Sequence, residues 1–312
     1  MPPALSASAS VSARISVSEA KAEQIFEALG ESFDSNATAV VASDHGDGRW
    51  TISLHFRDAP NETAVRALVA LAAGGEIANT LQFENHATKD WVEASLAGLA
   101  PVAAGRFVVH GAHDRARVRS NRIGIEIEAA LAFGTGHHGT TRGCLLALDR
   151  IVRSRSRPRP IASVLDLGTG SGVLAIAAAR ALRKPVLASD NDWRAVATAR
   201  ANARHNRVVA FVETVRAEGL NASRLRERAP FDLVLANILL APLKALAAPL
   251  ARLIGPNGRV VLSGLLVAQS NAALAAYRTH GLVLERRLCL DGWATLVLRR
   301  RRRTGVAGRR RR

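Results

Sequence analysis

The second half of the chain alternates between apolar runs of strand length and longer stretches with helical periodicity. This alternation limits the possible folds more than any other feature of the sequence. Strands are expected at 163–168, 185–190, 208–212, 231–237, 258–264, 282–288 and 293–299, and helices at 171–183, 192–205, 240–254 and 266–279. Strands that alternate with helices form βαβ units, with parallel strands and helices on both faces of the sheet. The residues from about 140 onwards therefore predict an α/β sheet.

The last two expected strands differ from the others in their connection. Only Cys289–Gly292 separates them, which is too short for the crossover that joins parallel strands. They should form an antiparallel hairpin at one edge of the sheet. The predicted topology is thus seven strands with one antiparallel member.

The first 112 residues predict a smaller α+β unit. Helices are expected at 19–30 and after Asn61, and strands at 37–42 and 49–56, with short β-rich pieces at 106–109 and 122–128. The Ser- and Ala-rich start, Met1–Ser18, is expected to be a frayed N-terminus. Nothing in this unit resembles a catalytic constellation, so it is interpreted as a recognition module.

Charge is unevenly distributed along the chain, whose formal net charge is +17. Residues 1–112 carry 7 Lys/Arg against 13 Asp/Glu, residues 113–298 carry 27 against 13, and residues 299–312 add nine arginines and no acid. A basic surface attracts polyanions through counterion release. Arginine outnumbers lysine 39 to 4, however, as a GC-rich genome produces without selection for binding. Charge alone therefore leaves both interpretations open.

Several classes of protein are excluded by composition. The two cysteines, Cys144 and Cys289, lie far apart and form no metal-binding or disulfide pattern. No apolar run approaches the roughly 18 residues of a membrane helix. The adjacent His137 and His138 lack a third ligand at suitable spacing, so no metal site is predicted. We expect a cytoplasmic protein.

A glycine-rich turn follows the first strand of the predicted sheet. The sequence Asp166–Gly172 reads DLGTGSG, and glycines let the backbone approach a ligand closely. The second strand ends at Asp190, where a carboxylate can accept bonds from both hydroxyls of a ribose. Val173 breaks the dinucleotide fingerprint. The D-x-G-x-G-x-G spacing instead resembles that of class I S-adenosylmethionine-dependent methyltransferases, which implies that Gly168 and Gly170 face the methionine part of the cofactor and Asp190 its ribose.

The fourth strand ends in Asn237 of the segment LANIL. An amide there can hold an amine nitrogen near the methyl donor without placing a competing nucleophile beside it. The alternative is structural, because asparagine is also a good N-cap for the helix expected at 240–254. Both roles are compatible.

Four segments together resemble one family, the PrmA family of ribosomal-protein methyltransferases. They are ALAFGTGHHGTT (130–141), LDLGTGSGVLAIAAA (165–179), FDLVLANILLAPL (231–243) and RVVLSGLLVAQ (259–269). The resemblance, over about 122–298, implies a Rossmann-like seven-stranded sheet with a smaller N-terminal α+β substrate-recognition domain. It also implies methylation of lysine ε-amines and an N-terminal amine on large-subunit ribosomal protein L11. The family's cofactor contacts fall here on Thr141, Gly168, Asp190 and Asn237.

The chain departs from the family pattern in the upstream motif. The family commonly has GTGTHPTT, where this chain has His137 and Gly139 in place of threonine and proline. Thr141 is retained, so the cofactor contact is expected to survive. The fixed φ of proline is lost, and with it some rigidity of the loop.

The predicted division of the chain has four parts. They are an acidic substrate-recognition domain at 1–112, a linker and cofactor-loop segment at 113–139, a methyltransferase domain at 140–298 and a basic disordered tail at 299–312. No general base is assigned. The protein is expected to be a monomer whose basic surface and tail add weak, nonspecific contact with ribosomal RNA. Two alternatives remain: a relative acting on a different protein lysine, or an RNA-associated protein with a vestigial methyltransferase fold.

Overall fold

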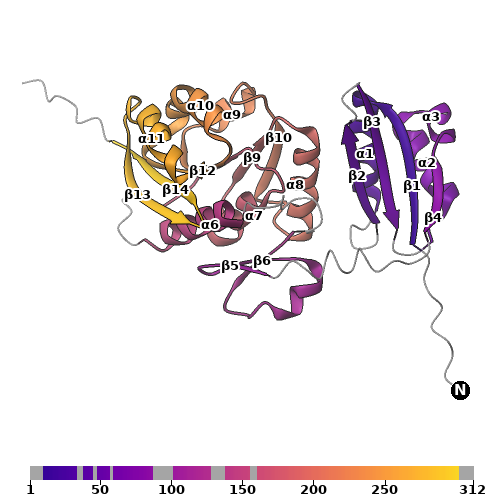
Figure 1. The fold of residues 1–312 in the computed structure, drawn as a ribbon, viewed down its shortest axis with the longest axis horizontal. Coiled ribbons are helices and arrows are strands. Elements are labelled where there is room, and N and C mark those ends of the chain that lie inside the picture. The colour runs from indigo at the N-terminus through magenta and orange to yellow at the C-terminus, as the bar shows by residue number, and fades with distance from the viewer. Residues whose placement is uncertain are drawn as a thin grey trace, which may run out of the picture. The chain divides into compact units, whose positions relative to one another are not determined.

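The structure is a computed structural model that divides into two compact units, Met1–Ala100 and Pro101–Arg312. It describes residues 10–33, 38–44, 48–56, 59–86, 101–127, 138–154 and 160–301. Figure 1 shows the elements of each unit as ribbons. Among the described residues, no helix has both the length and the apolar composition needed to cross a membrane.

The described residues of the first unit form a four-stranded antiparallel sheet with three helices. Its strands lie in the order β2-β3-β1-β4. The elements are β1 (Ser10–Ser18), α1 (Glu19–Ser32), β2 (Thr38–Asp44), β3 (Arg49–Phe56), α2 (Glu62–Ala73), α3 (Gly75–Asn79) and β4 (Gln82–His86). The Asn61 side chain accepts a bond from the backbone N–H of Ala64 and caps α2. The predicted helices and the two predicted strands are confirmed.

The expectation of a frayed N-terminus is wrong for part of Met1–Ser18. Residues 10–18 form β1, which pairs with β3 on one side and with β4 on the other. Val11, Ala13 and Ile15 are buried at alternate positions, while Arg14 and Ser16 are exposed. This period of two is the pattern of a strand with one face in the core. Residues 1–9 lie outside the described part.

The second unit contains the predicted seven-stranded sheet, in the order β10-β9-β8-β11-β12-β14-β13. Its strands are β8 (Val164–Leu167), β9 (Val186–Asp190), β10 (Val212–Arg216), β11 (Phe231–Asn237), β12 (Ile254–Leu266), β13 (Leu282–Leu290) and β14 (Trp293–Arg300). Its helices are α6 (His138–Arg153), α7 (Val173–Leu182), α8 (Trp193–His205), α9 (Ser223–Arg228), α10 (Leu240–Leu253), η2 (Val267–Gln269) and α11 (Ser270–Arg278). Only β14 runs antiparallel to its neighbours, β12 and β13, which confirms the edge hairpin.

Two details of this sheet differ from the prediction. The third strand was expected at 208–212, but β10 begins at Val212 and ends at Arg216, opposite Asp190. Val208 is buried before the strand begins, which explains its apolar character. The basic tail was expected from residue 299, but Arg299 and Arg300 belong to β14 and pair with β12 and β13. Residues 302–312 lie outside the described part.

Helices cover both faces of the seven-stranded sheet, as the βαβ pattern predicts. In β8, Val164 packs in one cluster with residues of α6 and α7, and its neighbour Leu165 packs in another with residues of α10 and α11. Successive side chains of a strand point to opposite faces, so each strand supplies both clusters. Both clusters belong entirely to the second unit.

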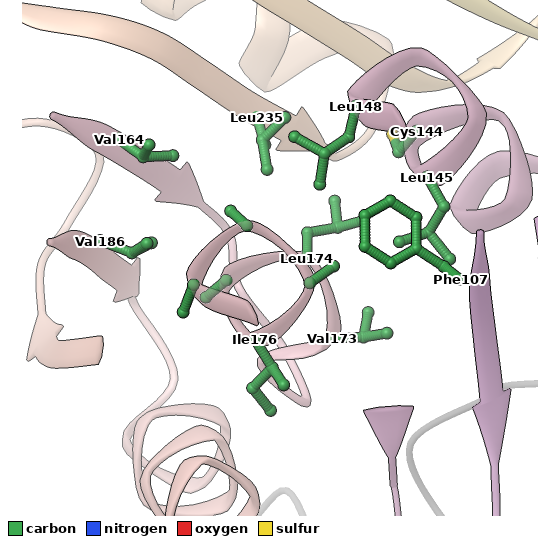
Figure 2. Packing of buried hydrophobic residues seen from close by; sticks show 14 of the residues in the cluster. Phe107, Cys144, Leu145, Leu148, Val164, Val173, Leu174, Ile176, Val186 and Leu235 are labelled. Carbon is green, nitrogen blue, oxygen red and sulfur yellow. The ribbon is translucent and has the colours of Figure 1, made fainter. Parts of the chain in front are cut away.

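A small three-stranded sheet also belongs to the second unit. Its strands are β5 (Val102–Ala104), β6 (Phe107–His110) and β7 (Ile123–Glu126), with the short helix η1 (Ala112–Arg117) between the last two. Figure 2 shows Phe107 of β6 in the same cluster as Leu145 of α6 and Leu174 of α7. The boundary expected after residue 112 therefore differs from the compact units, which divide after Ala100, because β6 packs with the later residues.

Candidate functional site

The glycine-rich turn between β8 and α7 is tied to the end of the neighbouring strand β9. The backbone N–H groups of Gly168 and Thr169 both donate to the carbonyl oxygen of Ser189, at 2.8 and 3.0 Å. Gly170 has a φ of +54°, and no atom lies within 4 Å of the position that a Cβ would occupy there. The backbone of the turn therefore borders open space that a side chain would otherwise enter.

Asp166 supports this turn from inside the protein. Its side chain is fully buried, and one carboxyl oxygen accepts bonds from the Thr169 hydroxyl at 2.7 Å and from the Ala175 N–H at 2.9 Å. Burial raises the pKa of Asp166 to about 7, because the charged form loses its hydration. Asp166 therefore connects the two ends of the turn and does not face the open side.

Asp190, at the end of β9, faces the glycine-rich turn. One carboxylate oxygen accepts a bond from the Gly170 N–H at 2.9 Å, and the other accepts one from the Asp192 N–H at 3.1 Å. A carboxylate has about four acceptor positions, so each oxygen keeps capacity for a further donor. Such a pair of acceptors suits two adjacent hydroxyl groups.

Asn237 ends β11 and contacts the first turn of α6. Its amide nitrogen donates to the hydroxyl oxygens of Thr140 and Thr141, at 3.3 and 3.4 Å. Both threonines are buried, at 2% and 7% exposure. Because the nitrogen is engaged by the threonines, the amide oxygen is the atom left to accept a bond from a ligand.

Ser263 supports this contact and is a residue that the sequence analysis did not single out. It is fully buried at the end of β12, directly opposite Asn237. Its hydroxyl donates to the carbonyl oxygen of Thr140 at 3.2 Å and contacts the Thr295 hydroxyl at 3.0 Å. The available signal was a single serine that follows an apolar strand, RVVLS.

Ile238 lies between Gly168, in the turn after β8, and Gly264, in β12. A Cβ on Gly168 would collide with the Ile238 side chain, and a Cβ on Gly264 would lie 2.5 Å from the Ile238 carbonyl oxygen. The glycines therefore allow β8, β11 and β12 to end close together.

The structure brings the predicted site residues to one edge of the sheet. Gly170 bonds to Asp190, Thr141 bonds to Asn237, and Gly168 lies against the residue that follows Asn237. His137, which replaces the family's threonine in the upstream motif, lies outside the described residues. Within the described part of the chain, no three His, Cys, Asp or Glu side chains gather as metal ligands would.

The order of the strands reverses at β8, between β9 and β11. In α/β sheets, ligands bind outside the carboxyl ends of the strands at such a switch point. With its antiparallel β14 inserted before β13, this sheet is that of the class I S-adenosylmethionine-dependent methyltransferases.

Comparison with known proteins defines the family. The model of the ribosomal protein L11 methyltransferase (PrmA) family matches residues 7–301. The ribosomal protein L11 methyltransferase of Rhodopseudomonas palustris (strain BisB5) is 56% identical over 280 residues, which cover 90% of this chain and 94% of that protein. The one from Bradyrhizobium diazoefficiens is 56% identical over 283 residues, covering 91% and 95%. This chain therefore belongs to the PrmA family, which confirms the resemblance seen in the sequence.

A solved structure supports the same conclusion. The crystal structure of a ribosomal protein L11 methylase from Lactobacillus delbrueckii subsp. bulgaricus matches with a TM-score of 0.57 and 26% identity. The match covers 65% of this chain and all of that one.

The site fits the cofactor of this class. The open side of Gly170, the remaining acceptor capacity of Asp190 and the uncommitted amide oxygen of Asn237 lie along the ends of β8, β9 and β11. Glycine backbone suits close approach of the methionine part, and the carboxylate suits the ribose hydroxyls.

Proposed function

We propose that this protein transfers methyl groups from S-adenosylmethionine to lysine ε-amines and the N-terminal amine of ribosomal protein L11. The observation that carries the proposal is the orientation of Asn237. Its amide nitrogen donates to Thr140 and Thr141. The amide oxygen is then left to accept a hydrogen bond from a substrate amine next to the cofactor. The relatives' names supply the substrate.

The cofactor contacts are assigned to five residues. Asp190 holds the ribose hydroxyls, the backbone of Gly168 and Gly170 lies against the methionine part, and Thr141 and Asn237 border the sulfonium. When bound, the cofactor would supply an electrophilic methyl group on its sulfonium, and breaking of that S–C bond would leave S-adenosylhomocysteine.

Asn237 acts by positioning the acceptor. Its amide oxygen accepts a hydrogen bond from the neutral amine and directs the nitrogen lone pair along the line of attack. Holding the reacting atoms at near-attack distance lowers the barrier without covalent help from the protein. An amide stabilises the ammonium form of the amine less than a carboxylate does, because it carries no net charge.

The acceptor lysine must lose its proton before attack. Asp166 is buried behind the glycine-rich turn, and Asp190 is assigned to the ribose, so neither is assigned as a general base. The lysine gives its proton to solvent water before it is enclosed, and exclusion of water from the site then favours the neutral amine.

The acidic N-terminal part is proposed to recognise the substrate. Residues 1–112 carry 7 Lys/Arg against 13 Asp/Glu, and a negative surface speeds and orients encounter with a basic protein. The protein acts in the cytoplasm as a monomer. Its basic body and tail add weak, salt-sensitive contact with ribosomal RNA.

Calorimetric titration with S-adenosylmethionine tests the cofactor site. The unmodified protein should bind with micromolar affinity, and Asp190→Ala should lose measurable binding. Asp192→Ala is the matched control, because the Asp192 carboxylate caps α8 and pairs with Arg194 instead. Absence of binding to the unmodified protein contradicts the proposal.

Mass spectrometry of purified ribosomal protein L11 tests the substrate. Incubation with the protein and cofactor should add methyl groups to lysines and the N-terminus, and Asn237→Ala should slow this about 100-fold or more, as loss of a transition-state contact does. Cofactor binding without methylation of L11 would favour a different protein substrate.

A further inference from the structure

A cavity lies in the second unit, between α6 and the strands β12, β13 and β14 and away from the candidate site. Its volume is about 620 Å³, within the range of small-ligand sites. The C-terminal half of α6 forms one wall, and β12, β13 and β14 form the other. The lining residue Arg259 precedes Ser263 by four positions in β12, and Ser263 lies opposite Asn237 of the candidate site.

Both acidic side chains that line the cavity are already paired. Asp149 accepts a bond from Arg106 at 2.6 Å. Glu285 accepts two bonds from Arg259, at 2.7 and 2.9 Å, and this pairing lowers the pKa of Glu285. Each carboxylate is therefore already hydrogen-bonded to an arginine.

Three further arginines of the lining form no hydrogen bond or ion pair with an acid among the described residues, although the charge of Arg286 helps to lower the pKa of Glu285. Arg150 and Arg153 lie one turn apart at the end of α6, and Arg286 lies on β13. All three are exposed. The two α6 arginines are favoured at a helix C-terminus by the helix dipole, but that effect does not account for Arg286.

A β-bulge places Arg286 in the cavity. The register of β13 against β14 shifts between Leu284 and Arg286, so that Glu285 is an extra residue. Consecutive strand residues normally face opposite sides, yet Glu285 and Arg286 both line the cavity. The bulge re-aims one side chain, as bulges do, and directs Arg286 to the side occupied by the α6 arginines.

Four apolar residues also line the cavity: Leu146 and Leu288 are half-buried, while Ile151 and Val297 are buried. We propose that the cavity binds the backbone of single-stranded RNA, with Arg150, Arg153 and Arg286 on successive phosphates and a base against the exposed parts of Leu146 and Leu288. Arginine matches phosphate in a bidentate geometry. An acidic peptide would use the charges but not the apolar surface. The inference rests on the RNA contact in the proposed function and gives that contact a site.

Fluorescence anisotropy with a labelled single-stranded RNA oligonucleotide tests this site. The cavity variant combines Arg150→Gln, Arg153→Gln and Arg286→Gln in the full chain. The control variant combines Arg207→Gln, Arg252→Gln and Arg278→Gln, which removes the same charge from exposed positions outside the cavity. Thermal melting of both variants checks that each is folded.

The cavity variant should bind RNA at least about 10-fold more weakly, and the control within about 2-fold of the unmodified protein. The slope of log affinity against log salt should flatten by about 2 in the cavity variant alone, since each phosphate contact on a single strand contributes about 0.7. If both variants lose RNA affinity equally, the cavity is not a specific site, and RNA binds to the basic surface in general.

Two other outcomes separate this inference from the proposal on which it rests. If the unmodified protein binds no RNA, the proposed RNA contact fails together with its site. If a polyglutamate peptide binds more tightly than RNA and only the cavity variant loses it, the cavity is an acidic-peptide site and the RNA assignment is overturned.

Discussion

Asp166 is a carboxyl group held entirely inside the protein at the base of the glycine-rich turn. Its folded pKa, about 7, lies well above that of an exposed aspartate because burial penalises the charged form. Between roughly pH 4 and pH 7 the folded state therefore binds more protons than the unfolded state. Stability from this group is greatest at low pH and falls as the pH rises towards 7.

Replacing Asp166 with asparagine should remove this pH dependence. Relative to Asp166→Asn, the unmodified protein should lose about 2–3 kcal/mol of stability as the pH rises from 5 to 7.5. Urea unfolding of both proteins at several pH values measures this difference. Stability curves that run parallel over this range would show that burial does not perturb Asp166.

Gly170 offers a test of cofactor binding that leaves the fold intact. Gly170 and Gly281 both have positive φ, and neither has an atom within 4 Å of a built Cβ. Alanine at either position should cost a similar 1–2 kcal/mol or so of backbone strain. Gly170→Ala alone should also weaken S-adenosylmethionine binding, by about 10-fold or more, because its methyl group enters the cofactor space. If Gly170→Ala and Gly281→Ala bind S-adenosylmethionine equally well in calorimetry, the cofactor does not lie against this turn.

At the scale of elements, the ends of β11 and β12 are fitted closely around Ile238. Gly264 has a φ of +81°, and its Cβ would meet three backbone atoms of Ile238 at 2.5 to 3.0 Å. The backbone cannot move aside as a flexible side chain would, so any larger residue must separate the two strands.

Gly264→Ala should therefore cost more than its own backbone strain. We expect a loss of unfolding free energy about 1–3 kcal/mol beyond that of Gly292→Ala, which has a similar φ but open space around it. Methyl transfer should also slow, because Asn237 precedes the displaced Ile238. Thermal or urea unfolding compares the two variants, and equal stability would show that the strand ends adapt freely.

The parallel sheet was predictable because its strands are apolar on both faces and read as continuous runs. The strand β1 was missed because serines separate its buried residues and give the segment the composition of a frayed end. The helix α6 was missed because its first turn carries the His- and Gly-containing motif.

The candidate site also contains residues that were predictable from the sequence and one that was not. The placement of Thr141, Gly168, Asp190 and Asn237 at one edge of the sheet was predictable because each sits in a motif or at the end of a strand. The support from Ser263 depends on strand register, which places it opposite Asn237 and next to α6. Sequence spacing does not reveal that register.

At the scale of the whole molecule, each unit buries apolar residues of its own, and all five proposed cofactor contacts lie in the second unit. A fragment of residues 101–312 should therefore fold and bind S-adenosylmethionine within about 3-fold of the full chain. It should not methylate L11, because it lacks the acidic recognition domain. Calorimetry tests cofactor binding by the fragment, and mass spectrometry tests methylation of L11. Methylation of L11 by the fragment would contradict the proposal that residues 1–100 recognise the substrate.

Phe107 and Val109 precede the cofactor motifs in the chain, yet they are buried in the core that supports them. Recombination between family members is therefore tolerated at some points and not at others. A chimera joined just before Pro101 exchanges the recognition domain and keeps β5 and β6 with their own packing partners. A chimera joined after residue 112 pairs a foreign β6 with a native α6, so the useful crossover lies upstream of the small sheet.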